Sequence, residues 1–185
     1  MKITTTSIEG VIILEPTIFR DERGFFCESF NQREFLKETG IDAIFVQDNH
    51  SHSVQGALRG LHYQAQQAQG KLVRVVHGKI FDVVVDLRHG TPTFGKWASF
   101  ELSEENHQQL WIPPGLAHGF LTLSASADVL YKTTDYYAPE HERTLVWNDP
   151  EIGAEWPLDQ VLGMNLSEKD RQGMSWREVK KEILY

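Results

Sequence analysis

Two residues in the stretch LRGLHYQ, at positions 58–64, are of types that carry out chemistry in many proteins. Arg59 and His62 lie three positions apart in an otherwise apolar segment, with Gly60 between them. Histidine titrates near neutral pH, so it can serve as a general base or as a metal ligand. A hydrogen-bonded core histidine is the third interpretation. For any one of these residues alone, a purely structural role is the ordinary expectation.

The metal interpretation fails on the number of ligands. A mononuclear site in a β-barrel commonly needs a second histidine two residues after the first, but Gln64 stands there, and Lys71 follows where a carboxylate would be useful. His50 and His52 do have that spacing, but no matching third ligand lies nearby. Because a metal centre needs at least three protein ligands, we expect no metal site.

The acid–base interpretation gains support from two residues further along the chain. Strand alternation puts Tyr131 on one face with Val129, and Lys71 on one face with Val73. Both polar groups could point into a barrel interior, where each needs a partner or a purpose. A histidine that removes a proton, a lysine that stabilises an enolate and a tyrosine that returns a proton fit proton abstraction beside a carbonyl.

The same alternation raises a problem for Arg59 and His62. Three positions apart on a regular strand, their side chains lie on opposite faces. Gly60 could supply a β-bulge that turns one of them toward the other. The sequence leaves this open.

The segments that carry these residues predict an all-β fold. They are short, rich in β-branched and aromatic residues, and separated by turn signals, as in a sandwich or barrel. Little helical pattern lies between them, so a parallel sheet with crossover helices is not expected. The predicted strands are 43–51, 71–78, 79–88, 97–103, 109–113, 118–124 and 128–137.

Two helices are predicted outside this region. Asn31 can cap the first, Glu34 completes a capping box, and Gly40 can end it in the left-handed conformation. Ser167 can cap a second helix that begins at SEKD.

Composition limits the possible classes of function. With 185 residues the chain predicts one domain. It has no apolar run near the ~20 residues of a membrane span and no signal peptide at its start, so we expect a cytoplasmic protein without membrane contact. The single cysteine, Cys27, fits a reducing compartment. The net charge of −8 argues against nucleic-acid binding, and an anionic substrate would need a local cluster of Arg and Lys.

Ordered blocks along the chain resemble the dTDP-4-dehydrorhamnose 3,5-epimerase family, from about Ile3 to about Asp170. The blocks include DERGFFCESF, FVQDNHS, LRGLHYQ, QGKLVRVVHGKIFDVVVDLR, TFGKW, QLWIPPGLAHGFLTLS, YKTTDYYAPEHE and WNDPEIGAEWP. The resemblance implies a cupin-type jelly-roll β-barrel with a few short peripheral helices. It implies a single epimerase domain over 1–185, with a core barrel at roughly 43–137 and a C-terminal extension at roughly 138–185. It also implies a homodimer that needs neither a metal nor another cofactor.

The family inverts C3 and C5 of dTDP-4-dehydro-6-deoxy-D-glucose and gives dTDP-4-dehydro-L-rhamnose. Both carbons adjoin the C4 ketone, so either deprotonation gives an enolate on the same oxygen. By motif position the resemblance implies that His62 is the base, Tyr131 the acid and Asp170 the partner that orients His62. Lys71 would stabilise the enolate oxygen, and His118 would line the sugar pocket.

The resemblance also implies a binding site for the nucleotide. The thymidine end would meet residues supplied by the partner subunit, which are Arg23, Phe26 and Glu28. The phosphates and sugars would meet Gln47, Asn49, Arg59 and Tyr137, with Asp48 beside them. Glu142 and Lys169 match further binding positions. Arg23, Arg59, Lys71 and Lys169 would form the cationic cluster that an anionic substrate requires.

We therefore expect an isomerase of dTDP-L-rhamnose biosynthesis, which supplies lipopolysaccharide and other surface polysaccharides. Three alternatives stay open at this point. The closest is a mono-epimerase that inverts only C3 or only C5 of a related sugar. The others are a non-catalytic barrel that binds nucleotide sugars and a metal-dependent cupin oxygenase.

Overall fold

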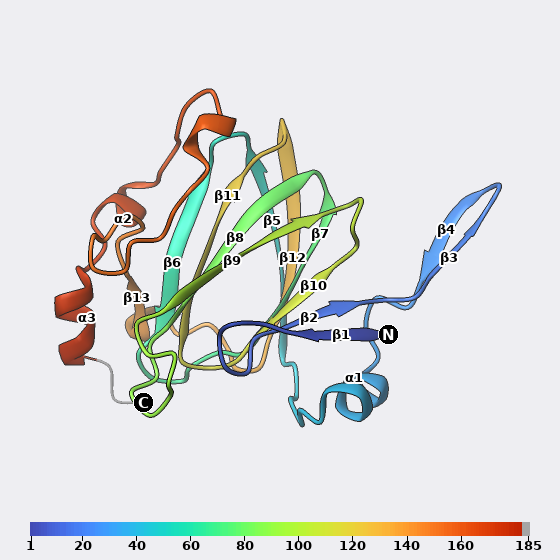
Figure 1. The fold of residues 1–185 in the computed structure, drawn as a ribbon, viewed down its shortest axis with the longest axis horizontal. Helices are drawn as coiled ribbons and strands as arrows, with labels where there is room; N and C mark the ends of the chain where they lie inside the picture. The colour runs from blue at the N-terminus through green and yellow to red at the C-terminus, as the bar shows by residue number, and fades with distance from the viewer. Residues whose placement is uncertain (183–185) are drawn as a thin grey trace.

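Two antiparallel sheets packed face to face form the body of the molecule in the computed structural model, which describes residues 1–182 (Figure 1). The six-stranded sheet runs in the order β1 (Lys2–Thr5), β2 (Ile12–Glu15), β10 (Gln109–Ile112), β7 (Lys71–His77), β12 (Ser126–Thr133), β5 (Gln47–Val54). The five-stranded sheet runs β13 (Glu142–Thr144), β6 (Leu58–Gln64), β11 (Leu116–Thr122), β8 (Lys79–Asp86), β9 (Trp97–Ser103). The predicted all-β jelly-roll class is confirmed.

The core between the sheets follows from strand alternation. Val73 and Val129 point inward from the six-stranded sheet, and Val84 and Leu102 meet them from the five-stranded sheet, all with no exposed surface. Each such side chain contributes about 1.5–3 kcal/mol to stability through burial. Alternate side chains of β7 and β12 therefore point between the sheets. Lys71 and Tyr131 stand two positions from these valines, so their side chains point the same way.

The outer face of the six-stranded sheet is covered by α1 (Gln32–Thr39). Phe35 of this helix packs on Leu72 and Trp111. As predicted, the side chain of Asn31 accepts hydrogen bonds at the helix start, and Gly40 ends the helix at φ 72°.

The C-terminal segment covers the outer face of the five-stranded sheet. It contains η1 (Pro139–His141), η2 (Leu158–Gln160), α2 (Glu168–Arg171) and α3 (Trp176–Glu182). Trp176 and Val179 belong to the apolar cluster on that face. Ser167 caps α2, as predicted, whereas α3 is a helix that the sequence interpretation missed.

Several predicted bounds need correction. The strand predicted at 43–51 is β5, which starts four residues later because 43–45 turn away to pack with α1. The strand predicted at 128–137 ends at Thr133, whose hydroxyl donates to the carbonyl of Asp135 in a turn. Strands β1, β2 and β13, which lie outside the core barrel expected at roughly 43–137, also pair into the sheets, and the single domain stays a prediction. The end of the predicted domain, 183–185, lies outside the described residues.

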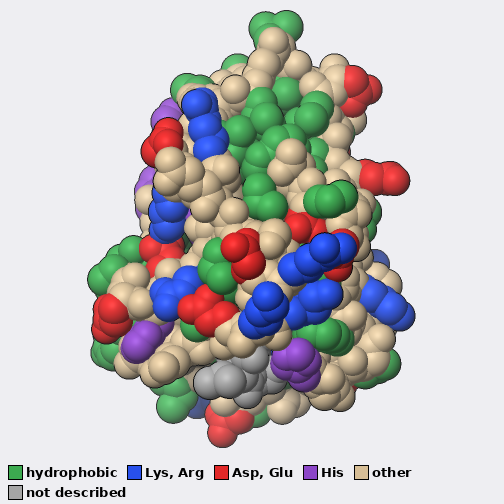
Figure 2. All heavy atoms as spheres, turned by 90° about the vertical axis from the view of Figure 1, so that its left-hand side faces the viewer, with side chains coloured by type: hydrophobic (Ala, Val, Ile, Leu, Met, Phe, Trp, Pro, Cys, Tyr) green, Lys and Arg blue, Asp and Glu red, His purple; other side chains and the backbone are tan. Residues whose placement is uncertain are grey.

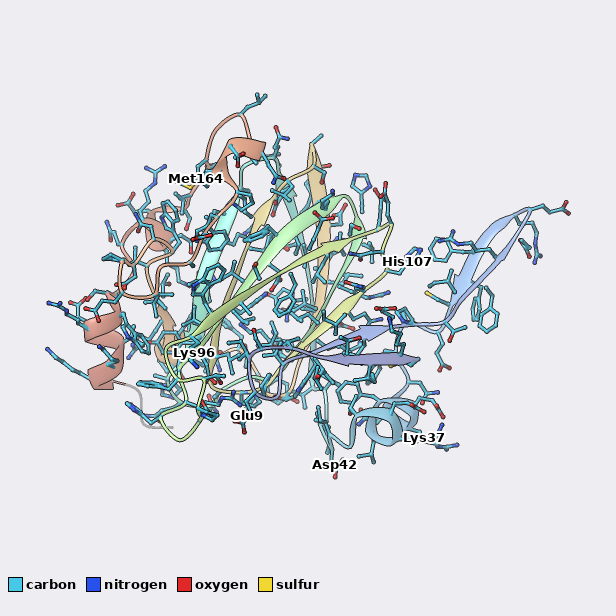
Figure 3. All side chains as sticks on the ribbon, in the orientation of Figure 1. Glu9, Lys37, Asp42, Lys96, His107 and Met164 are labelled. Atoms are coloured by element: carbon cyan, nitrogen blue, oxygen red, sulfur yellow. The ribbon has the colours of Figure 1, made fainter. Side chains whose placement is uncertain are left out.

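A two-stranded hairpin, β3 (Ile18–Asp21) and β4 (Gly24–Cys27), projects from the body of the molecule (Figure 1). Its strands were not predicted. It exposes the rings of Phe25 and Phe26. His107 lies near its base (Figure 3), where Arg20 donates to His107 Nε2 and the ring of Phe25 packs against the imidazole.

Charges of both signs lie side by side on the face formed by the C-terminal segment (Figure 2). Three of the basic side chains form ion pairs: Arg143 with Glu182, and both Arg177 and Lys180 with Glu151. Within residues 1–182, every helix is too short or too polar to cross a membrane.

Candidate active site

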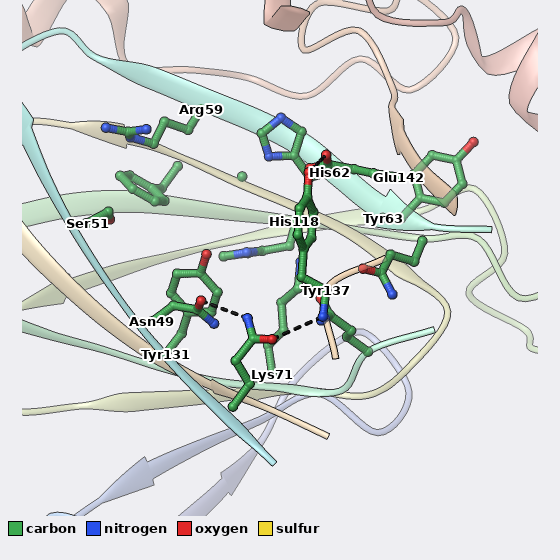
Figure 4. A pocket seen from close by; sticks show the side chains of 15 residues that line it. Asn49, Ser51, Arg59, His62, Tyr63, Lys71, His118, Tyr131, Tyr137 and Glu142 are labelled. Atoms are coloured by element: carbon green, nitrogen blue, oxygen red, sulfur yellow. Dashed lines mark hydrogen bonds between the residues drawn. The ribbon is translucent and has the colours of Figure 1, made fainter. Parts of the chain in front are cut away.

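A cavity of about 400 Å³ opens between the two sheets and gathers most of the predicted site residues (Figure 4). Its walls come from β5, β6, β7, β11 and β12, with the segment around η1 at the rim. The predicted residues in its lining are Gln47, Asn49, Arg59, His62, Lys71, His118, Tyr131, Tyr137 and Glu142.

His62 is held by a carboxylate from the far end of the chain. Its Nε2 lies 2.7 Å from Asp170 Oδ1, and Asp170 is only 4% exposed. Burial raises the pKa of Asp170, but hydrogen bonds from His62, Ser167 and the Gly60 amide outweigh it and leave that pKa below its ordinary value. Asp170 is thus ionised at neutral pH. Nε2 of His62 donates to it, which leaves the basic lone pair on Nδ1.

The predicted bulge at Gly60 brings Arg59 and His62 to the same cavity. His118 pairs with His62 and Phe120 pairs with Arg59, so β6 has one extra residue between these pairs. Gly60 takes φ +103°, and a Cβ there would stand 2.6 Å from the carbonyl oxygen of His118. Only glycine fits this close approach of β6 to β11.

Lys71 is a buried cation that forms no ion pair with any residue in the part of the chain that the structure describes. Burial lowers its pKa to about 8, against the opposing attraction of Asp82 and Glu142. Asp82, which is fully buried, lies 2.8 Å from His118 Nε2. Burial raises the pKa of Asp82, and the nearby His118 and Lys71 partly reverse this. Lys71 and His118 line the cavity, and the buried Asp82 holds His118 without lining the cavity itself.

Tyr131 faces the cavity from the sheet opposite His62. It lies on β12, and His62 lies on β6, so the two side chains reach the cavity from different walls (Figure 4). Burial raises the pKa of the Tyr131 hydroxyl further above neutral pH, so this group is protonated and can serve as a proton donor. Arg59 opposes this shift and Glu142 adds to it. A base and an acid on opposite walls suit removal and return of a proton on opposite faces of a substrate.

Hydrogen bonds organise the rim of the cavity. Gln47 donates to Asn49 and accepts from the backbone amide of Tyr137. The hydroxyl of Tyr137 donates to Glu142 at 2.6 Å, which raises the pKa of Tyr137 to about 12. Glu142 also pairs with Lys169 at 2.5 Å.

Two hydrogen bonds hold the guanidinium of Arg59. Its Nε donates to the hydroxyl of Ser53, and its Nη2 donates to the carbonyl of His52. Arg59 and Lys71 are therefore the two members of the predicted cationic cluster that line the cavity.

The other predicted residues lie outside this lining. Asp48 points to the opposite face of β5 and pairs with Lys132. Arg23 and Phe26 lie on the exposed hairpin, where Arg23 pairs with Asp21, and Glu28 follows the hairpin and accepts from Asn31.

Sequence reasoning missed Asp82. A signal was present, because alternation along β8 places Asp82 on the same face as Ile80 and Val84, which point into the core. A lone aspartate among such residues needs a partner, and His118 is that partner.

No set of metal ligands is brought together. Among residues 1–182, no group of three or more His, Cys, Asp or Glu side chains could hold a metal ion. The expectation of chemistry without a metal stays a prediction, which metal analysis of the purified protein checks.

Comparisons with known proteins point to one family. The family model described as dTDP-4-dehydrorhamnose 3,5-epimerase matches residues 5–178. A dTDP-4-dehydrorhamnose 3,5-epimerase of Pseudomonas aeruginosa is 59% identical over 97% of this chain and 98% of its own length. An RmlC 3,5-epimerase of Legionella pneumophila, solved with dTDP-4-keto-L-rhamnose, is 50% identical with a TM-score of 0.95 and covers 99% of this chain and 96% of its own. ChmJ, a 3'-monoepimerase of Streptomyces bikiniensis, is 35% identical with a TM-score of 0.88 over 95% of this chain and 88% of its own.

Proposed function

The chain belongs to the dTDP-4-dehydrorhamnose 3,5-epimerase family, and we propose how its cavity carries out the family's reaction. It is an isomerase of dTDP-L-rhamnose biosynthesis that inverts C3 and C5 of dTDP-4-dehydro-6-deoxy-D-glucose and gives dTDP-4-dehydro-L-rhamnose. The observation that carries the mechanism is the placement of His62 and Tyr131 on opposite walls of one cavity.

His62 removes the proton from the carbon beside the C4 ketone. The carbon–hydrogen electron pair forms a double bond from that carbon to C4, and the π electron pair of the C4 carbonyl moves onto its oxygen, which gives the enolate. Asp170 stabilises the imidazolium that forms, because it is an ionised acceptor held on Nε2. Tyr131 then donates its proton to the same carbon from the other face, and the ketone is restored with inverted configuration. Because C3 and C5 both adjoin C4, one set of groups serves both inversions.

Lys71 stabilises the enolate oxygen. A buried ammonium acts in a medium of low dielectric constant, where its attraction to a developing negative charge is strong. His118, held by Asp82, lines the sugar pocket beside it.

The diphosphate binds at Arg59, whose planar guanidinium can donate two parallel hydrogen bonds to phosphate oxygens. Gln47, Asn49 and Tyr137 hold the nucleotide along the rim.

A second copy of the chain supplies the thymidine end of the site. Arg23, Phe26 and Glu28 are absent from the lining of their own chain's cavity, and Phe26 is 69% exposed on a projecting hairpin. In a symmetric homodimer each hairpin can reach the other chain's cavity, where Phe26 stacks on thymine. We further propose that the enzyme is cytoplasmic and that residues 1–185 form one domain.

Proton NMR of dTDP-4-dehydro-6-deoxy-D-glucose in D₂O with the protein tests this proposal. We expect deuterium to enter at both C3 and C5, and a downstream reductase to yield dTDP-L-rhamnose. His62→Ala should abolish both exchanges. Exchange at one carbon only would show a mono-epimerase, which is the class of activity to which ChmJ belongs. Nucleotide binding without any exchange would show a non-catalytic barrel.

A further inference from the structure

Asp82 is a buried carboxylate with only one of its two oxygens in a hydrogen bond. It lies on β8 with no exposed surface, on the same face as the core residues Ile80 and Val84. Its Oδ2 lies 2.8 Å from His118 Nε2. Its Oδ1 is buried and has no hydrogen-bond partner within residues 1–182. A buried carboxylate ordinarily has its oxygens hydrogen-bonded or faces a cation, so Oδ1 calls for an explanation.

Lys71 is a cation that faces the same interior from the other sheet. It points inward from β7 of the six-stranded sheet, whereas Asp82 points inward from β8 of the five-stranded sheet. Lys71 is buried and forms no ion pair in the described part of the chain. Because water solvates neither group well, the attraction between these opposite charges is strong and stabilises both.

Two carboxylates oppose the effect of burial on the pKa of Lys71, and Asp82 acts more strongly than Glu142. The charge of Glu142 is also shared with Lys169, which pairs with it. Asp82 is therefore the main negative charge that acts on Lys71. The titratable and charged groups that share the interior with Lys71 are Asp82 on β8, Glu142 on β13, Arg59 and His62 on β6, His118 on β11, Tyr131 on β12 and Tyr137 beyond the end of β12.

We propose that Asp82 is a positioning residue that acts through Lys71: its buried charge, anchored by His118, keeps the Lys71 side chain an ammonium that can stabilise the enolate. Asp82 has no exposed surface, so its effect on the reaction passes through its neighbours. The inference rests on the proposed function, in which Lys71 stabilises an enolate. It adds a fully buried residue of β8 to the groups on which the reaction depends.

Asp82→Asn tests this inference with the full-length enzyme and the dTDP-sugar substrate. Asparagine has nearly the same shape, and its carbonyl oxygen can still accept from His118, so the change removes mainly the charge. The pKa of Lys71, about 8 in the parent enzyme, should then fall, because less attraction opposes the effect of burial. The fall in kcat/KM at alkaline pH should therefore begin about one pH unit lower. At about pH 9 the variant should be about tenfold less active than the parent, and at about pH 6 the two should be close.

Two controls separate this effect from a general loss of structure. Asp86→Asn removes another fully buried carboxylate of β8, which pairs with Arg88 and lies outside the lining of the cavity. It should lower the melting temperature without moving the pH profile. Lys71→Arg stays charged, so adding Asp82→Asn to it should not make kcat/KM more sensitive to alkaline pH. If Asp82→Asn were too unstable to purify, Asp82→Ser, which also accepts a hydrogen bond, would give the same comparison.

A pH profile of Asp82→Asn that superimposes on that of the parent enzyme would overturn the inference, because Asp82 would then be neutral or without effect on Lys71. An equal loss of kcat/KM at every pH would overturn it as well and leave Asp82 with a structural role. Neither result touches the proposed function, which fails only if the parent enzyme exchanges no substrate protons in D₂O.

Discussion

At the scale of single residues, the proposed proton acceptor and the proposed proton donor lie on different sheets and face one cavity. His62 belongs to the five-stranded sheet and Tyr131 to the six-stranded sheet. Each is tuned by a different means. A buried, ionised Asp170 holds the imidazole, whereas burial, with a smaller contribution from Glu142, raises the pKa of the Tyr131 phenol. A substrate ring between them would meet the proposed base on one face and the proposed acid on the other.

Tyr131→Phe should separate the two halves of the reaction. Loss of the hydroxyl leaves His62 able to remove protons, so deuterium exchange should continue, while inversion at C5 should fall by about 10²–10⁴-fold. Product analysis by NMR checks this. Tyr136→Phe is the matched control, because Tyr136 is exposed and lies outside the lining of the cavity, so C5 inversion should stay intact. Normal product formation by Tyr131→Phe would refute the assigned role.

The pH dependence should report Lys71. Burial lowers its pKa to about 8 in the free enzyme, so the ammonium is present below that pH and is lost above it. Because the charged form stabilises the enolate, kcat/KM should fall as the pH rises through about 8. Lys71→Arg stays charged at every accessible pH, so the kcat/KM that this variant retains should not fall over the same pH range. If Lys71→Arg showed the same fall in kcat/KM with rising pH, that fall would belong to the titration of another group.

At the scale of elements, the bulge in β6 brings two of the proposed site residues to one cavity. Gly60 lets β6 approach β11 closely, and the extra residue brings both Arg59 and His62 to the cavity. The backbone amide of Gly60 also donates to Asp170, so the bulge helps to hold the carboxylate that contacts His62.

Gly60→Ala should damage both stability and activity. Its Cβ would meet backbone atoms at 2.6 and 2.7 Å, and φ +103° is unfavourable for alanine. We expect a loss of about 2–4 kcal/mol in the free energy of unfolding, measured by urea denaturation. Gly90→Ala is the control, because nothing lies within 4 Å of its added Cβ. Equal stability of the two variants would contradict the role of the bulge.

The elements also show how far the sequence could predict the site. The alternation of side chains along a strand was enough to predict that Lys71 and Tyr131 point between the sheets, because the valines on the same faces are buried there. It could not pair His62 with Asp170, 108 positions away, since that contact depends on where the C-terminal segment folds back. Family resemblance supplied that pair. The hairpin strands β3 and β4 were missed, because their exposed aromatic residues have no inward-facing pattern.

At the scale of the whole molecule, the proposed homodimer makes each active site a shared structure. His62 and Tyr131 would come from one chain, and Arg23 and Phe26 from the hairpin of the other. Two variants that are each inactive should then complement one another. His62→Ala destroys the base but keeps an intact hairpin, whereas a chain with Arg23→Ala and Phe26→Ala keeps the base but loses the thymidine contacts.

Co-expression of these two chains with different affinity tags, followed by isolation of the mixed dimer, tests the sharing directly. One site of the mixed dimer combines an intact His62 with an intact hairpin, so its activity should be about half that of the parent dimer. The other site carries both defects and should be inactive. A dimer of the hairpin variant alone is the control for residual activity. If the hairpin served its own chain, each site of the mixed dimer would carry one defect and no activity would return, and a monomer in solution would contradict the shared site altogether.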